Sequence, residues 1–200
     1  QNLYVLFNQK ESEELLGKAR EASKKIEEKQ GEEYEIYKWF IEISIKKVKQ
    51  LMSVLEIDFD DWRGESTYNS HLKGVVEELV NKNLAVRSEG ALIVDLNDVG
   101  LGVAVVERTD GASLYITRDL AAVEDRHKLY NFDKAIYITA IEQKNHFAKL
   151  IEICKRLNRS YANKIEHVAY GFFSMPEGKI SSRKGKQAVI EEILEEAVLS

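Results

Sequence analysis

Several residue types are scarce in this chain, and each scarcity excludes a class of protein. The 200 residues include one cysteine and one proline, and the formal net charge is −5. A lone cysteine forms no disulfide within the chain and no cysteine-rich metal cluster, so Cys154, which lies in an apolar run, is predicted to be a core residue of a reducing compartment. No stretch approaches the roughly 18 apolar residues of a membrane span, and no signal peptide is visible.

Other signatures are missing as well. There is no Ser-His-Asp order, zinc-ligand spacing or Walker-type glycine loop, so neither a hydrolase triad nor a metal site is predicted. The negative net charge argues against a chain that coats nucleic acid by bulk electrostatics, although it leaves local basic patches open. The remaining composition, 44% hydrophobic and 32% charged, is typical of a soluble globular protein with one large domain, or one domain plus an insertion.

The first 60 residues are predicted to be helical. Residues 9–29 form one charged helical pattern, and residues 32–55 form a second with apolar residues three or four positions apart. Glycine interrupts them only at Gly17 and Gly31. We therefore expect a helical insertion or hairpin at 1–60.

The second part of the chain alternates strands and helices. The sequence predicts helices at 68–83, 118–129 and 143–157, strands at 91–94, 103–106, 113–116, 135–138 and 165–170, and a terminal helix from residue 187. From residue 113 the order is β-α-β-α-β-loop-α, which indicates an α/β fold with a doubly wound parallel sheet. Ligands of such sheets bind at the carboxyl ends of the strands, so the residues there are the candidates.

Polar side chains follow three of these strands. Tyr115 and Asp119 lie around the end of the 113–116 strand, and Gln143 and His146 follow the 135–138 strand. Tyr115 and Asp119 suit a cationic ligand, yet Asp119 also fits a first-turn carboxylate in a helix capped by Thr117. His146 also fits a partly exposed helix residue and Gln143 a helix cap. The local sequence leaves both readings open.

The third strand leads to a cationic loop, Gly178-Lys179-Ile180-Ser181-Ser182-Arg183-Lys184-Gly185-Lys186. Its two glycines allow the backbone many conformations, and four cations and two hydroxyls lie between and beside them. These features are typical of a loop that closes over a polyphosphate. A run of charge is also common on solvated surfaces. Its position between a strand and a helix favours the phosphate interpretation.

Together these motifs resemble the arginyl-tRNA synthetases, which are class I aminoacyl-tRNA synthetases. The resemblance covers roughly residues 34–200 and is strongest from residue 88 onward. Its motifs are Gly64-Glu65-Ser66, Gly90–Leu96, the D-G-x-x-x-Y-x-T-R-D signature at Asp110–Asp119, Phe132–Tyr137, Glu142–Phe147, His167–Gly171 and Lys179–Gly185. Any one of these motifs is weak alone, whereas their common order and spacing are specific.

The resemblance implies a reaction and a set of roles. L-Arginine would react with ATP, expected with Mg²⁺, to give arginyl-adenylate, and the arginyl group would pass to tRNA(Arg) in the cytoplasm without a membrane. Such chemistry needs positioning and charge stabilisation rather than an acid–base pair. Each implied role falls on residues of the motifs: the arginine site on Glu65, Tyr115, Asp119 and Gln143, the ATP site on His146, Val168, Lys179 and Arg183, and the catalytic loop on Lys179, Ser181, Ser182 and Lys184.

The sequence departs from the family in two places. Ser182 stands where class I loops have a second lysine, and Arg183 or Lys184 is expected to supply that charge. The His-x-Gly-His element is absent, because none of the four histidines lies in that context. The chain also starts without methionine and ends inside a helical pattern. We therefore expect a fragment, inactive by itself, with residues 61–200 forming the C-terminal half of the catalytic domain.

Two other interpretations remain open. The chain fits a half-length relative that acts as a non-catalytic binding module for arginine, RNA or another protein. It also fits an unrelated flavodoxin-like binding domain, although that does not explain the tyrosine–aspartate pair or the lysine–serine loop. Arginine binding that requires Asp119, without any response to flavin, distinguishes the synthetase interpretation from the last one.

Overall fold

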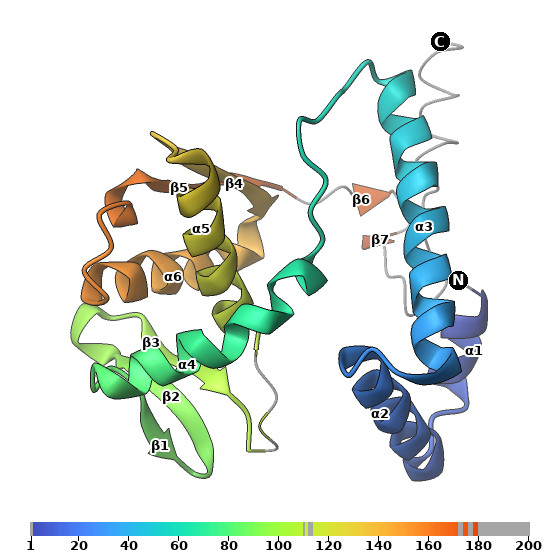
Figure 1. Ribbon diagram of the computed structural model, residues 1–200, viewed down its shortest axis with the longest axis horizontal. Coiled ribbons are helices and arrows are strands. Elements are labelled where there is room, and N and C mark those ends of the chain that lie inside the picture. The colour runs from blue at the N-terminus through green and yellow to red at the C-terminus, as the bar shows by residue number, and fades with distance from the viewer. Residues whose placement is uncertain (1, 110, 112–113, 172–173, 176–177, 180–200) are drawn as a thin grey trace. The chain divides into compact units, whose positions relative to one another are not determined.

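The computed structural model describes residues 2–109, 111, 114–171, 174–175 and 178–179 (Figure 1). The described residues form two compact units. One contains residues 2–62 together with two short strands near the C-terminus, and the other contains residues 63–171. Each unit is described by itself.

The first unit is mainly helical. Its elements are α1 (Asn2–Gln9), α2 (Glu13–Glu27), α3 (Gly31–Val54) and the antiparallel strands β6 (Ser174–Met175) and β7 (Gly178–Lys179). The two helices predicted at 9–29 and 32–55 are confirmed as α2 and α3, whereas α1 was not predicted. Ser12 caps α2 because its hydroxyl accepts a hydrogen bond from the Leu15 amide at 3.3 Å. An ion pair of 2.5 Å between Lys25 and Glu33 joins α2 to α3.

The second unit mixes helices and strands. In chain order it contains η1 (Glu65–His71), α4 (Leu72–Asn81), β1 (Val86–Ser88), β2 (Ala91–Leu96), η2 (Asn97–Val99), β3 (Gly102–Glu107), α5 (Tyr115–Tyr130), β4 (Ala135–Ala140), η3 (Ile141–Gln143), α6 (Lys144–Arg156), η4 (Ala162–Lys164) and β5 (Ile165–Tyr170). Here η denotes a 3₁₀ helix. The α/β class predicted from the sequence is therefore present.

Two small sheets organise this unit. Strands β1, β2 and β3 form an antiparallel sheet, and β4 and β5 pair in parallel with Ile138 opposite Val168. Glu89 and Gly90 connect β1 to β2 with positive φ angles of 50° and 83°, as a tight hairpin turn requires. The doubly wound sheet predicted from the sequence appears, within the described part of the chain, as one parallel pair.

The core joins the two sheets through the helices. Apolar side chains on one face of β2 and β3 are buried with those of α5 and α6, among them Val94, Val106, Val123, Leu150 and Ile153. Cys154 is fully buried in the same cluster, which confirms its predicted core position. In Figure 1, α6 lies against one side of β4 and β5, and α4 crosses one end of α5. The opposite face of the pair exposes Ile136, Ile138 and Val168.

Two predictions about the start of α5 are wrong. Residues 115–116 are not a strand, because α5 already begins at Tyr115. Thr117 does not cap that helix. It lies inside the first turn, fully buried, and Leu114 occupies the cap position. The helix predicted at 68–83 is divided into η1 and α4, and it begins three residues earlier, at Glu65.

Some expectations fall elsewhere. The predicted helix from residue 187 lies outside the described residues, as do Asp110 and Ser113. Within the described ranges, no helix has the length and apolar character that crossing a membrane requires.

Candidate functional site

The contact between α5 and α6 brings two predicted site residues together. Nε2 of His146, in the first turn of α6, lies 2.6 Å from Oδ2 of Asp119 in α5. The two side chains keep 25% and 33% of their surface exposed, so the pair lies at the rim of the unit rather than in its core. Solvent, or a ligand, can therefore reach the Asp119 carboxylate.

The imidazole of His146 has an aromatic support. Its ring stands edge-on to Phe147 with centroids 5.2 Å apart, and Phe147 is buried. Phe147 in turn stacks on His167 of β5 at 4.7 Å and 15°. Nε2 of His167 lies 2.9 Å from the Thr139 hydroxyl of β4. The ring beside Asp119 is thus connected to both strands of the parallel pair.

A tyrosine–arginine contact is joined to the same aromatic group through Phe147. Arg126 of α5 donates a hydrogen bond of 3.1 Å to the hydroxyl of Tyr137, whose ring lies 4.8 Å from that of Phe147. Burial raises the pKa of Tyr137, Arg126 opposes that rise, and the negative charge of Asp119 adds to it. Arg126 and Asp119 therefore act in opposite directions on the same largely buried hydroxyl.

The other residues predicted to bind arginine lie in the same unit. Tyr115 is the first residue of α5, one helical turn before Asp119, and its side chain is exposed. Gln143 ends η3, three residues before His146, and is also exposed. Glu65 begins η1, which is fixed to α5 because Tyr68 is buried against Ala121 and Ala122. Each of these residues lies on α5 itself or on a short helix that contacts α5 or α6.

The residues predicted to bind ATP are only partly described. Val168 is on the exposed face of β5, whereas His146 contacts Asp119. The backbone of Lys179 is in β7, but its side chain lies outside the described residues. Ser181, Ser182, Arg183 and Lys184 lie wholly outside the described residues. Their predicted roles remain predictions.

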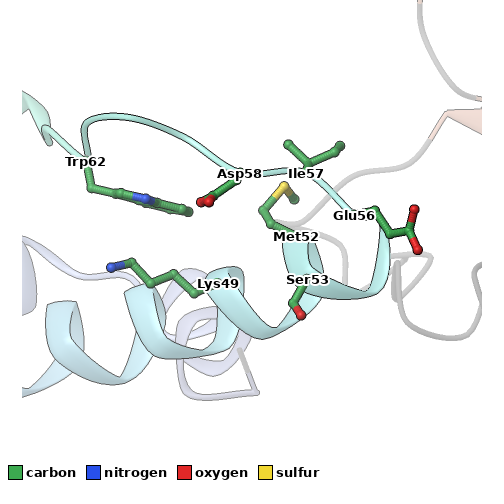
Figure 2. Close-up of a pocket in the computed structure, with 7 residues that line it drawn as sticks. All are labelled: Lys49, Met52, Ser53, Glu56, Ile57, Asp58 and Trp62. Carbon is green, nitrogen blue, oxygen red and sulfur yellow. The ribbon is translucent and has the colours of Figure 1, made fainter.

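Some hollows lined by described residues lie elsewhere, and two of them illustrate this. One, of about 380 Å³ in the first unit, is lined by Lys49, Met52, Ser53, Glu56, Ile57, Asp58 and Trp62 (Figure 2). Its Lys49 ammonium lies 5.1 Å from the centre of the Trp62 ring. The other, of about 340 Å³, lies between α4 and α5 beside Glu78 and Glu124. Neither hollow is lined by a residue predicted from the motifs.

The sequence does not identify the residues that hold the Asp119–His146 pair in place. It presents Tyr137 and Phe147 only as the ends of two motifs, and it gives no signal for Arg126. The alternation of β4 indicates that Tyr137 faces away from Ile136 and Ile138, but it does not say which face α6 covers. Among the described residues, no group of three or more His, Cys, Asp or Glu side chains is placed to hold a metal ion.

Comparisons with known proteins agree on one family. The family described as "tRNA synthetases class I (R), catalytic domain" matches residues 2–199. The arginine–tRNA ligase of Enterococcus faecalis is 41% identical over 198 residues, which are 98% of this chain and 35% of that protein. That of Halothermothrix orenii is 38% identical, with the same coverage. The chain therefore spans about a third of the length of these relatives.

Solved structures support the same fold. The arginyl-tRNA synthetase of Plasmodium falciparum superimposes with a TM-score of 0.70 at 24% identity, covering 80% of this chain and 28% of that one. A putative arginyl-tRNA synthetase of Campylobacter jejuni gives a TM-score of 0.68 at 20% identity, covering 92% and 42%. The match over 2–199 establishes that the chain belongs to the family of class I tRNA synthetase catalytic domains for arginine.

Proposed function

We propose that the chain supplies part of an arginine–tRNA ligase, which activates L-arginine with ATP to arginyl-adenylate and transfers the arginyl group to tRNA(Arg). The family match and the names of the relatives support this function. The structural observation that carries it is an accessible carboxylate, Asp119, held at the α5–α6 contact. A carboxylate accepts two parallel hydrogen bonds from a guanidinium, a geometry that lysine does not match.

In this proposal the arginine site surrounds Asp119. Its carboxylate receives the guanidinium, and Tyr115 lies one helical turn away on the same face of α5. Glu65 adds a second negative charge from η1, and Gln143 holds the amino-acid backbone end. The proximity of these elements to α5 and α6 supports the grouping.

The nucleotide is bound by other groups. Val168 contributes from β5, while Lys179, Ser181, Ser182, Arg183 and Lys184 brace the phosphates in the transition state. ATP is expected as its Mg²⁺ complex, so that the metal enters with the substrate. A single buried thiol is consistent with a reducing, cytoplasmic location, which is also part of the proposal.

The parallel pair is proposed to be a piece of a larger sheet. Two strands make an unusually small parallel sheet, and helices normally cover both faces of a parallel sheet. Here one face exposes Ile136, Ile138 and Val168, which supports residues 61–200 as the C-terminal half of a doubly wound catalytic domain. Residues 1–60 then form the helical connecting segment. By itself the chain is proposed to lack activity.

Calorimetry tests the arginine site. L-Arginine should bind the chain more tightly than L-lysine, and flavin mononucleotide should not bind. Asp119→Asn should weaken arginine about thirtyfold, because hydrogen bonds to charged groups contribute about 2 kcal/mol. Asp133→Asn, which changes a fully exposed aspartate, is the matched control and should bind as the unchanged chain does. Equal affinity in the two variants contradicts the assignment of Asp119, and binding of flavin favours the flavodoxin-like interpretation.

A further inference from the structure

We propose that His146 is a positioning residue, whose imidazole orients the Asp119 carboxylate for a guanidinium. This inference rests on the proposed arginine site and adds a residue to it. It also moves His146 away from the ATP-binding role suggested by its motif. The observation behind it is the distance of 2.6 Å between Nε2 of His146 and Oδ2 of Asp119.

The direction of this hydrogen bond follows from the chemistry of the two groups. An ionised carboxylate only accepts hydrogen bonds, so the proton lies on Nε2 and His146 donates. Each carboxylate oxygen has two acceptor sites, so Oδ2 retains one of them. Among the described residues, Oδ1 of Asp119 has no hydrogen-bond partner. The bond to His146 thus fixes the carboxylate plane and leaves acceptor sites on both oxygens for the two parallel donors of a guanidinium.

The imidazole can only orient a carboxylate if it is held itself. Its edge-on contact with the buried Phe147, at 5.2 Å, restricts the ring on one side. Phe147 cannot turn freely, because it stacks on His167 and also contacts Tyr137. The first turn of α6 fixes the backbone of His146. The support therefore runs from the parallel strands through two rings to Asp119.

A purely structural role is the alternative, since the same bond joins α5 to α6. The two roles differ in what they predict for binding. A structural bond contributes to the free energy of unfolding and leaves the arginine affinity of the folded chain unchanged. A positioning bond changes that affinity even in a variant that folds well, because a rotating carboxylate must be ordered when the ligand binds.

Arginine affinity should be measured by calorimetry for the unchanged chain, His146→Ala and His146→Gln, with unfolding in urea measured in parallel. His146→Ala should weaken binding about tenfold, because the freed Asp119 carboxylate must then be ordered when arginine binds. Gln retains an N–H donor on a side chain of similar length, so His146→Gln should recover most of the affinity. Asn145→Ala changes the exposed neighbouring residue and is the matched control, expected to bind normally.

Three outcomes overturn the proposal. Unchanged affinity in a folded His146→Ala leaves only the structural role. Tighter binding in that variant means that His146 blocks the carboxylate rather than orienting it. Equal weakening in His146→Gln and His146→Ala removes the hydrogen bond as the cause.

A spectroscopic measurement separates this inference from the arginine assignment. Nitrogen-detected NMR of labelled histidine should show the His146 proton on Nε2, exchanging slowly with water in the unchanged chain and rapidly in Asp119→Ala. Failure to find it in the unchanged chain refutes the pair and with it the positioning role. If the proton is found but no variant binds arginine, the proposed arginine site fails while the hydrogen bond stands.

Discussion

The hydroxyl of Thr117 donates a hydrogen bond of 2.5 Å to the backbone carbonyl of Val106. Thr117 is in the first turn of α5 and fully buried, and Val106 is in the core of β3. This bond joins the start of the helix that carries Tyr115 and Asp119 to the antiparallel sheet. It therefore fixes the position of the proposed arginine-binding residues relative to the core.

Replacing Thr117 by valine should destabilise the second unit. Valine has nearly the same shape but no donor, so the Val106 carbonyl loses a buried partner, at a cost of about 1–2 kcal/mol. Unfolding in urea, followed by circular dichroism, measures the difference. Thr117→Ser keeps the hydroxyl and should lose less. If Thr117→Val is as stable as the unchanged chain, the hydrogen bond from Thr117 to Val106 does not hold α5 in place.

Arg159 joins three parts of the second unit. Its Nη2 atom lies 2.5 Å from carboxylate oxygens of both Glu78 in α4 and Glu124 in α5. Arg159→Met should lower the free energy of unfolding by about 1–2 kcal/mol, because the two carboxylates then face each other. This loss of stability stays modest, because Lys82 still pairs with Glu78 and Lys128 with Glu124.

A second substitution tests the origin of that loss. Glu78→Gln in the Arg159→Met background should recover part of the stability, because it removes one of the two facing charges. The same substitution in the unchanged chain should destabilise it. Additive effects in this double-mutant cycle would show that the arginine acts through packing alone.

Cys154 should be chemically inert in the folded chain. Burial raises the pKa of its thiol to about 12, so almost no thiolate exists near pH 8.5. Iodoacetamide should therefore alkylate the folded chain far more slowly than the chain in urea. Equal rates in the folded and unfolded chain would contradict the burial of this side chain.

The same shift predicts a loss of stability at alkaline pH. The pKa of the Cys154 thiol is higher in the folded chain than in the unfolded chain. The contribution of this thiol to the free energy of unfolding is therefore fully present below about pH 8.5. It falls by about 1.4 kcal/mol for each further pH unit until the folded pKa is reached. The unchanged chain should therefore weaken more steeply between pH 9 and 11 than Cys154→Ala, in which other titrating groups are the same. Parallel curves would contradict the prediction.

The chain alone should not catalyse arginine-dependent ATP–pyrophosphate exchange. The sequence contains no His-x-Gly-His element and spans 35% of its relatives. Radioactive pyrophosphate incorporated into ATP measures the reaction, with a complete arginine–tRNA ligase such as that of Enterococcus faecalis as the positive control. Exchange by the 200-residue chain that depends on arginine refutes its proposed inactivity.

Local patterns were sufficient for many of the elements. The strand predicted at 165–170 is β5 with the same bounds, and the helix predicted at 143–157 is α6 to within one residue at each end. In α6 the apolar residues recur three or four positions apart, and Gly171 directly follows β5. Such signals act within a few residues and can be read without the rest of the molecule.

At the start of α5, local sequence patterns predict the wrong secondary structure. Tyr115, Ile116 and Thr117 favour a strand by propensity, yet they form the first turn of a helix. The reason is tertiary, because Thr117 bonds to β3 and Ile116 enters the core. The contact between Asp119 and His146 depends in the same way on how α5 packs against α6. The sequence indicated both residues separately, but their contact is a property of the fold.

The most direct test of the account follows the ligand to individual residues. L-Arginine should be titrated into the ¹⁵N-labelled chain, with citrulline, its neutral analogue of similar shape, as the matched ligand. Arginine should shift the backbone amides around Asp119 and His146, and citrulline at the same concentration should shift them much less. Equal shifts with both ligands, or arginine shifts confined to other parts of the second unit, would contradict a carboxylate site for the guanidinium.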